Sequence, residues 1–182
     1  MPKQQPQLKR QASANPTKAS NKVVALSLEH ALEVLLSGKK VKRLDLRYRK
    51  IGDAGAEQLA AALEGNTSLT KLELDYNGIT SAGVTRIAEA LIKNVTLTHL
   101  YLCNNVIDDE GALHLAAALE ENRSLVQFYL SGNRISTAGA EAILNCIRRA
   151  SLTIDLDLSL QKVPESLQRE IRFPSWFRPD LF

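Results

Sequence analysis

The chain of 182 residues is poor in aromatic residues, cysteine and methionine. Its two cysteines, Cys103 and Cys146, are too few for a disulfide framework or a zinc motif, which favours a reduced intracellular protein in the cytoplasm. No apolar run approaches the roughly 18–20 residues that cross a bilayer. The N-terminal segment, residues 1–22, has no apolar centre, which argues against a secretory signal peptide.

The sequence also lacks the short motifs of catalysis and cofactor binding. It contains no GxxxxGK[ST], GxGxxG, HExxH or paired CxxC, and its three histidines are scattered. A thiol nucleophile can be imagined at Cys103, close in sequence to Tyr101 and His99, but an ordinary packed or surface cysteine explains this residue better. We therefore expect no enzyme activity, no catalytic residue, no metal and no cofactor.

Charge is distributed unevenly along the chain. Residues 1–50 carry 12 Lys and Arg against 3 Asp and Glu, whereas residues 51–182 carry 11 against 17. A basic segment can contact an acidic protein, nucleic acid or an anionic membrane. The tail has no interleaved aromatic residues, so binding to a membrane or nucleic acid is only the alternative function. It would combine the tail with Lys39, Lys40, Lys42, Arg43, Arg47, Arg49 and Lys50.

A repeat of 28 residues dominates the remaining sequence. Four segments align without a gap, starting at Val41, Leu69, Leu97 and Leu125. The opening LxxLxL of each segment alternates with a period of two, which predicts a short strand, and apolar residues spaced by four in the second half predict a helix. One such unit cannot bury its apolar face alone, so the sequence predicts a stack of strand–loop–helix–turn units.

Polar residues at the joints of each unit predict how its elements begin and end. Residue pairs with short oxygen side chains suit the helix starts, and asparagines after the helices tolerate a left-handed backbone that ends them. A further asparagine series lies where each strand turns away, and its amides would pair with backbone groups as a ladder. The helix starts are Gly52-Asp53, Thr80-Ser81, Asp108-Asp109 and Ser136-Thr137; the helix ends are Asn66, Asn94 and Asn122; the ladder is Asn77, Asn105 and Asn133, with Arg49 in the first repeat.

The pattern LxxLxLxxNxI in 28-residue units resembles the leucine-rich repeats of the ribonuclease-inhibitor type. The resemblance implies an α/β leucine-rich-repeat solenoid of curved right-handed β-loop-α repeats, with a parallel sheet on the concave face and helices on the convex face. The expected domains are a basic disordered tail at 1–22, a solenoid at 23–161 and a C-terminal cap at 162–182. Within the solenoid we expect an N-terminal capping helix at 23–40 and full repeats at 41–68, 69–96, 97–124 and 125–152.

The resemblance says little about function, because this scaffold serves many partners. We expect a monomeric, non-catalytic protein–protein interaction module that binds an unidentified partner protein on its concave face. No small-molecule substrate is expected. Related repeats occur in activators of small GTPases, such as the Ran GTPase-activating proteins, and in effectors that bacteria deliver into host cells. Regulation of a small GTPase and a role as such an effector, located in the host cytoplasm, are therefore further alternatives.

The expected concave face holds the candidate binding residues. Tyrosine gives a large contact area at a low entropic cost, and all four tyrosines lie on or beside this face, with Tyr48 and Tyr76 at the strand exits. We expect that removal of Tyr101 and Tyr129 weakens binding and leaves the melting temperature nearly unchanged. One row of the face should also run from basic to acidic. The candidate residues are Arg43, Arg47, Lys71, Glu73, Asp75, His99, Tyr101, Gln127, Tyr129, Asp155 and Asp157.

The few large aromatic residues gather at the end of the sequence. The last predicted strand has no following repeat, so its apolar edge would be open. Solenoids need atypical terminal units to shield their cores, and Pro174 and Pro179 favour an irregular wrap. We expect a structural cap, with a partner-binding motif as the alternative. The cap residues would be Phe173, Trp176, Phe177 and Phe182.

Overall fold

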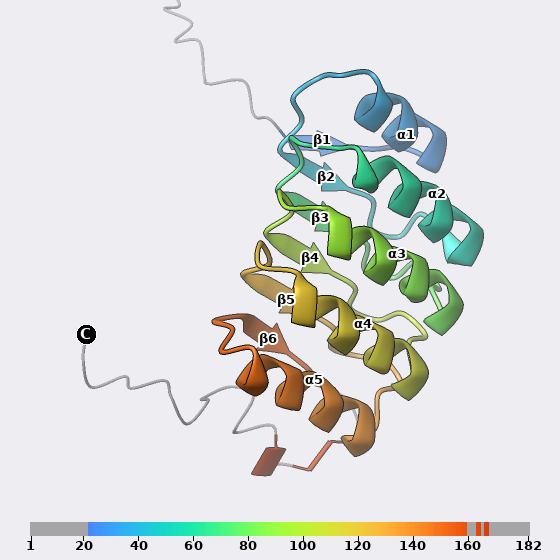
Figure 1. Ribbon diagram of the computed structural model, residues 1–182. Helices are drawn as coiled ribbons and strands as arrows, with labels where there is room; N and C mark the ends of the chain where they lie inside the picture. Colours follow the sequence, from blue (N-terminus) through green and yellow to red (C-terminus); the bar gives the residue numbers. More distant parts are fainter. Residues whose placement is uncertain (1–21, 160–162, 165, 168–182) are drawn as a thin grey trace, which may run out of the picture.

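Strands and helices alternate along the chain from one end of the molecule to the other (Figure 1). The computed structural model describes residues 22–159, 163–164 and 166–167. Every strand spans 3 residues, and four of the helices span 13. The elements are β1 (Lys22–Val24), α1 (Leu28–Leu36), β2 (Arg43–Asp45), α2 (Gly52–Glu64), β3 (Lys71–Glu73), α3 (Ser81–Lys93), β4 (His99–Tyr101), α4 (Asp109–Glu121), β5 (Gln127–Tyr129), α5 (Thr137–Arg149) and β6 (Asp155–Asp157).

The strands form one parallel sheet in sequence order, from β1 to β6. From β2 onwards each residue pairs with the residue 28 positions later, as Leu44 pairs with Leu72 and Leu72 with Leu100. The constant register places equivalent side chains of successive repeats in straight rows. All helices stack on one side of the sheet (Figure 1). The predicted fold class is therefore confirmed: an α/β solenoid with the sheet on its concave face and the helices on its convex face.

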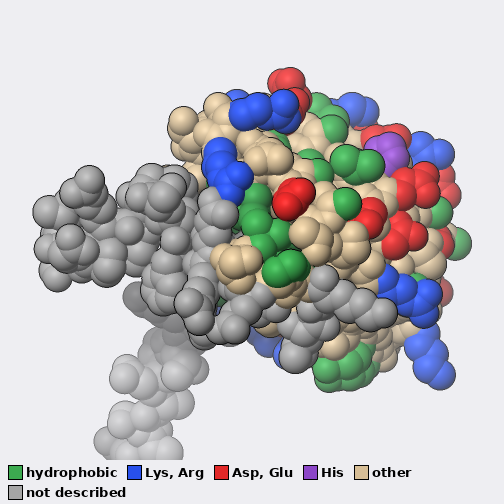
Figure 2. Space-filling model, turned by 90° about the horizontal axis from the view of Figure 1, so that it is seen from below, with side chains coloured by type: hydrophobic (Ala, Val, Ile, Leu, Met, Phe, Trp, Pro, Cys, Tyr) green, Lys and Arg blue, Asp and Glu red, His purple; other side chains and the backbone are tan. Residues whose placement is uncertain are grey.

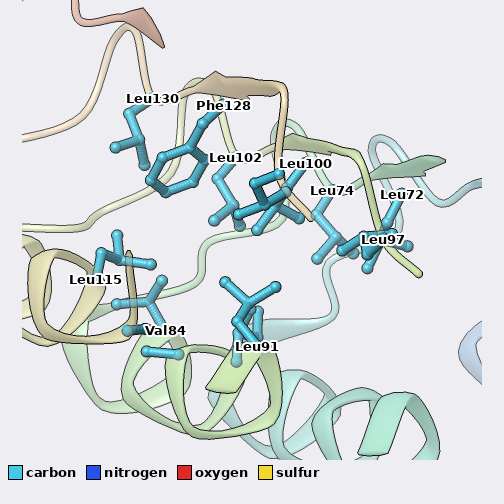
Figure 3. Packing of buried hydrophobic residues seen from close by; sticks show 14 of the residues in the cluster. Leu72, Leu74, Val84, Leu91, Leu97, Leu100, Leu102, Leu115, Phe128 and Leu130 are labelled. Carbon is cyan, nitrogen blue, oxygen red and sulfur yellow. The ribbon is translucent and has the colours of Figure 1, made fainter. Parts of the chain in front are cut away.

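The core lies between the sheet and the helices. Figure 3 shows leucine side chains from β3 and β4 pointing towards Val84 and Leu91 of α3 and Leu115 of α4. All of these side chains are at most 1% exposed, as is Phe128, which occupies the leucine position of β5. Burial of such side chains is the main favourable term in folding, so each repeat is stabilised chiefly by its neighbours.

Helix starts are linked from one repeat to the next. The predicted N-caps are confirmed at Thr80, Asp108 and Ser136, whose side chains accept hydrogen bonds from backbone N–H groups of the first turn. At Gly52-Asp53 the helix begins where predicted, but after Ile51 and without a side-chain cap, so only the predicted capping role is wrong. Asp53 instead accepts hydrogen bonds from the backbone N–H and the hydroxyl of Thr80, at 2.8 and 2.7 Å, and so supports the helix of the following repeat.

Asparagine side chains connect the turns that follow the strands. The Asn105 amide donates to the carbonyl oxygens of Leu74 and Leu102 at 3.1 and 2.9 Å, and its Oδ1 accepts from the backbone N–H of Asn77 at 3.0 Å. Asn77 and Asn133 make equivalent contacts. At the first repeat, the Arg49 side chain donates instead to the carbonyl oxygen of Ala25 at 2.9 Å.

The asparagines predicted at the helix ends form a second series that connects successive repeats, a role that the sequence did not indicate. Asn94 and Asn122 have extended backbone, with ψ of 120° and 131°, so the left-handed conformation predicted for them is wrong. Their amides donate to carbonyl groups of the preceding repeat: Asn94 to Leu63 at 2.8 Å and Asn122 to Leu91 at 2.7 Å. Both asparagines are therefore buried because they satisfy backbone groups between repeats.

The first unit differs from the predicted helix at 23–40. Lys22–Val24 forms β1, which pairs with β2, and α1 begins only at Leu28 with Ser27 as its N-cap. The boundary of the predicted tail is therefore wrong at Lys22; residues 1–21 lie outside the described residues. At the other end Val163 is buried. The predicted cap residues Phe173, Trp176, Phe177 and Phe182 also lie outside the described part.

Candidate interaction surface

The concave face, which is the side of the sheet away from the helices, presents two rows of side chains across the strands. Alternate residues of a strand point to opposite faces, so the residues that flank each buried leucine point away from the core. Strand pairing aligns them at intervals of about 4.8 Å. The first row is Arg43, Lys71, His99, Gln127 and Asp155, and the second is Asp45, Glu73, Tyr101, Tyr129 and Asp157.

Ion pairs link charged side chains on this face over β1, β2 and β3. The guanidinium of Arg47 binds both carboxylate oxygens of Asp45, at 2.9 and 2.7 Å, and lies 3.4 Å from Glu73 Oε2. Lys22 pairs with Asp45 at 3.3 Å and Lys71 pairs with Glu73 at 2.7 Å. The hydrogen bonds from Arg47 hold the pKa of Asp45 well below its usual range. Although Arg47 lies close, Glu73 Oε2 is buried and accepts no hydrogen bond.

These ion pairs weaken the expected charge gradient. The first row does run from Arg43 to Asp155, but Glu73 of the second row neutralises Lys71 on β3. At the other end, Asp155 accepts hydrogen bonds from Gln127 and Tyr129. The face therefore has a paired ionic half and a tyrosine half, rather than a smooth transition from basic to acidic.

Tyr101 and Tyr129 form an ordered aromatic pair, here called the concave-face pair. Their rings meet edge to face, with centroids 5.0 Å apart and planes at 80°. The hydroxyl of Tyr101 donates to Gln127 Oε1 at 2.7 Å, and that of Tyr129 donates to Asp155 Oδ2 at 2.6 Å. Lys71 Nζ lies 4.2 Å from the centre of the Tyr101 ring, a cation–π contact. Both rings are thus fixed at both ends by neighbouring strands.

The remaining candidate side chains near the concave-face pair include three titratable groups with shifted pKa values. Burial raises the pKa of the Cys103 thiol, which disfavours the thiolate that a nucleophile needs. Burial, together with the cations of Lys71 and Arg43, lowers the pKa of His99. Asp75 accepts a hydrogen bond from the backbone N–H of Cys103 at 2.7 Å, and burial raises the pKa of its carboxyl group. All three side chains are partly buried on this face.

Tyr48 and Tyr76 form a second pair where the chain leaves β2 and β3, here called the exit-edge pair. Their rings stack with centroids 4.4 Å apart and planes at 13°. They are 63% and 46% exposed. Both have left-handed backbone, with φ of 60° and 58°. This conformation brings Cβ of an L-residue close to the following carbonyl oxygen, so it is uncommon for bulky side chains.

The equivalent positions in the next two repeats are Asn104 and Gly132, with φ of 54° and 71°. These residue types tolerate the left-handed region, so the turn itself favours a small or amide side chain there. The sequence indicated that Tyr48 and Tyr76 are neighbours but not that their backbone is strained. The series Tyr, Tyr, Asn, Gly at one repeat position was the signal that could have revealed this.

The basic residues named for an anionic partner do not form one patch. One group precedes β2 and lies at the edge of the sheet where the strands start. The other group follows β2 and lies at the opposite edge. Arg43, which is exposed, lies on the face between the two groups. Acidic side chains are also prominent on the helix side in Figure 2, which views the molecule from below. The two separated groups are Lys39, Lys40 and Lys42, and Arg47, Arg49 and Lys50.

Within residues 22–159, 163–164 and 166–167, no three His, Cys, Asp or Glu side chains are grouped so that they could hold a metal ion. In the same described part of the chain, no helix combines the length and apolar character that a membrane span needs.

The repeated β-α units, the single parallel sheet and its open face define a repeat solenoid. The leucine-rich repeat family matches residues 39–60, 65–88, 93–116 and 121–144, and the chain belongs to this family. The resemblance inferred from the LxxLxLxxNxI pattern is thus confirmed at the level of the family.

Two solved structures illustrate the likeness of fold. A structure described as leiomodin-1 actin-binding site 2 superposes with a TM-score of 0.70 at 20% identity, covering 79% of this chain and 84% of that one. The tropomodulin C-terminal domain of Caenorhabditis elegans gives a TM-score of 0.61 at 16% identity, covering 79% and 88%. At these identities the likeness concerns the fold alone. A search of curated proteins by sequence found no significant match.

Proposed function

We propose that the chain is a non-catalytic protein-interaction module that binds a partner protein on its concave face. The observation that supports this most directly is the concave-face pair, Tyr101 and Tyr129, held in place on the open face of the sheet. Tyrosine is enriched among the residues that dominate binding energy at protein interfaces. Membership of the leucine-rich repeat family and the likeness to an actin-binding structure agree with this function.

Order within the face favours binding because it reduces the entropic cost of association. A flexible side chain that becomes immobile at an interface opposes binding, whereas one already held by its neighbours does not. Tyr101 is held by Lys71 and Gln127, and Tyr129 by Asp155. A partner would therefore meet two fixed rings bordered by hydrogen-bonding groups, and it would gain contact area without ordering the surface.

Actin is the first partner to test, because leiomodin-1 shares the fold and its structure is described as an actin-binding site. The experiment measures binding of the purified protein to labelled monomeric actin and co-sedimentation with filaments. Tyr101→Ala combined with Tyr129→Ala should weaken the interaction by about tenfold or more, since two aromatic contacts of about 1 kcal/mol each would be lost. Leu113→Ala is the matched control, because Leu113 lies in α4 on the convex face and is 58% exposed.

These outcomes test separately whether actin is the partner and whether the concave face is the binding surface. Absence of binding by the unmodified protein would eliminate actin as the partner. Equal binding by the Tyr101→Ala/Tyr129→Ala variant, with weaker binding by Leu113→Ala, would instead place the interaction on the helices and overturn the assignment to the concave face.

We also infer that the repeats are of the ribonuclease-inhibitor type, from the 28-residue period and the 13-residue helix in each full unit. A cytoplasmic location and a monomeric state are proposed from the free thiols and the low aromatic content of the sequence. Light scattering coupled to size exclusion would test the monomer, and fractionation of the source cells would test the location.

A further inference from the structure

The exit-edge pair has a backbone conformation that the fold does not require of tyrosine. Tyr48 and Tyr76 have φ of 60° and 58°, whereas Asn104 and Gly132 fill the same turn in later repeats. The turn can thus form with residues that relieve the steric contact of Cβ with the following carbonyl oxygen. Strained residues persist where other interactions outweigh the strain, and they concentrate at binding sites.

The contacts that Tyr48 and Tyr76 make within the folded chain explain little of why tyrosine occupies these two positions. The rings stack on each other at 4.4 Å, but they remain 63% and 46% exposed, so they contribute little to the core. A phenol is neutral near pH 7, and loss of hydration, followed by the influence of Tyr76, raises the pKa of Tyr48 further. The pair therefore offers an uncharged aromatic surface to the solvent at the edge of the sheet.

Two cationic residues, Arg47 and Lys50, lie close to Tyr48 in sequence, and both Arg47 and the carboxylate of Asp75 influence the pKa of Tyr48. The Arg47 side chain is 45% exposed, whereas its partners Asp45 and Glu73 are only 9% and 13% exposed. Arg47 uses Nε and one Nη2 proton for Asp45, so its other guanidinium N–H groups are available to a partner. Lys50 is exposed and makes no ion pair with any residue in the described part of the chain.

We propose that Tyr48, Tyr76, Arg47 and Lys50 form a second binding site, which takes an acidic, proline-containing polypeptide segment. Proline rings pack well on exposed aromatic rings, and extended proline-rich segments lose little entropy when they bind. Acidic residues beside the prolines would accept hydrogen bonds from Arg47 and Lys50. The site lies at the edge of the sheet, apart from the concave-face pair, so it does not depend on the function proposed above.

A peptide fits this site better than a nucleic acid does. Binding to nucleic acid relies on several cations along the phosphate backbone. Here Asp45 and Glu73 neutralise much of the charge of Arg47, and Lys39, Lys40 and Lys42 lie at the opposite edge of the sheet. The site therefore lacks a continuous basic track, but it retains short-range donors for individual carboxylates.

The test uses the full chain and three fluorescein-labelled probes. The first is a synthetic peptide in which glutamates flank Pro-Pro-Leu-Pro, the second has lysines in place of the glutamates, and the third is a short oligothymidylate. Fluorescence anisotropy should detect binding of the glutamate peptide, and Tyr48→Asn combined with Tyr76→Asn should weaken it at least about fivefold, as expected for the loss of one good contact. Asparagine is chosen because Asn104 adopts the same backbone conformation.

Three results with the unmodified protein would overturn the proposal. These are the absence of binding by the glutamate peptide, equal binding of the lysine peptide, and tighter binding of the oligothymidylate, which would identify a nucleic-acid site instead. Binding that survives in the Tyr48→Asn/Tyr76→Asn variant would equally exclude these rings. Leu113→Ala on α4 is the control for non-specific effects, and a melting temperature that does not fall shows that the double variant is folded. Actin binding by the Tyr101→Ala/Tyr129→Ala variant tests the concave-face pair instead.

Discussion

The two tyrosine pairs occupy neighbouring parts of one surface but are built in opposite ways. The concave-face pair, Tyr101 and Tyr129, has relaxed strand backbone, and both hydroxyl groups donate to residues of the following strands. The exit-edge pair, Tyr48 and Tyr76, has strained left-handed backbone and exposed rings. The same residue type thus stabilises the sheet at one place and adds strain at the other.

This difference teaches how stability and recognition can be separated in a repeat protein. Among equivalent positions of successive repeats, a residue whose backbone conformation is favourable for its type can be explained by folding alone. A residue that is unfavourable there, while its neighbours show a better choice, points to selection by something outside the fold. By this criterion the fold explains the exit-edge pair least, whereas contacts within the sheet explain part of the concave-face pair.

The largest expected effect comes from the ladder residue that connects the two regions. Asn105 follows β4, which carries Tyr101, and its Oδ1 accepts from the backbone of the loop that carries Tyr76. Asn105→Ala should lower the free energy of unfolding by about 3 kcal/mol, because several buried backbone groups would lose their partners. Urea denaturation measures this, and a loss below about 1 kcal/mol would mean that water replaces the amide.

The second prediction concerns the concave-face pair itself. Tyr101→Ala combined with Tyr129→Ala should lower the free energy of unfolding by about 2 kcal/mol, since an edge-to-face contact and two hydrogen bonds disappear. The sequence alone led us to expect a nearly unchanged melting temperature, and the contacts with Gln127 and Asp155 change that expectation. Calorimetry distinguishes these two expectations. An unchanged melting temperature would show that these contacts contribute little to the free energy of unfolding.

The third prediction reverses the sign for the exit-edge pair. Tyr48→Asn combined with Tyr76→Asn should raise the melting temperature by about 2–4 °C, the shift expected for relief of roughly 1 kcal/mol in a chain of this size. The melting temperature of the Tyr48→Ala/Tyr76→Ala variant provides a comparison, because alanine removes the rings but does not favour the left-handed region. A clear fall in the asparagine variant would show that stacking outweighs the strain.

The smallest effect is a dependence of stability on alkaline pH. The hydrogen bond to Asp155 and burial raise the pKa of Tyr129 above the usual value for a phenol, about 10. A raised pKa in the folded state means that this contribution to stability is complete below pH 10 and declines as the pH rises further. Denaturation at pH 9 and pH 11 should therefore show a smaller decline for Tyr129→Phe than for the unmodified chain. An equal decline would assign the effect to other groups.

Much of the fold could be predicted from the sequence because its signal is repeated. The 28-residue period, the strand and helix halves and the row positions such as Leu72 and Leu100 follow from local patterns that neighbouring repeats reinforce. The N-caps at Thr80, Asp108 and Ser136 were predicted for the same reason. Prediction failed where a unit departs from the repeat, as at the start of α2, which has no side-chain cap, and in the extra strand Lys22–Val24.

The candidate surface could be predicted only in part. Its residues follow from strand alternation, but their partners do not, because a side chain can reach along its own strand or across to the next. Arg47 turns back to Asp45, and Lys71 pairs with Glu73, which weakens the charge gradient that the first row indicates. The helix-end asparagines Asn94 and Asn122 were likewise identified correctly as turn residues and assigned the wrong backbone.

The sequence by itself determined the family, the number and length of the repeats and which side chains share a row, because these depend on periodicity alone. Only the tertiary structure decided which tyrosines are held by hydrogen bonds, which are strained and exposed, and which charges neutralise each other. The physical reason is that these properties arise between repeats. Residues about 28 positions apart in sequence come into contact only when the sheet brings their strands together.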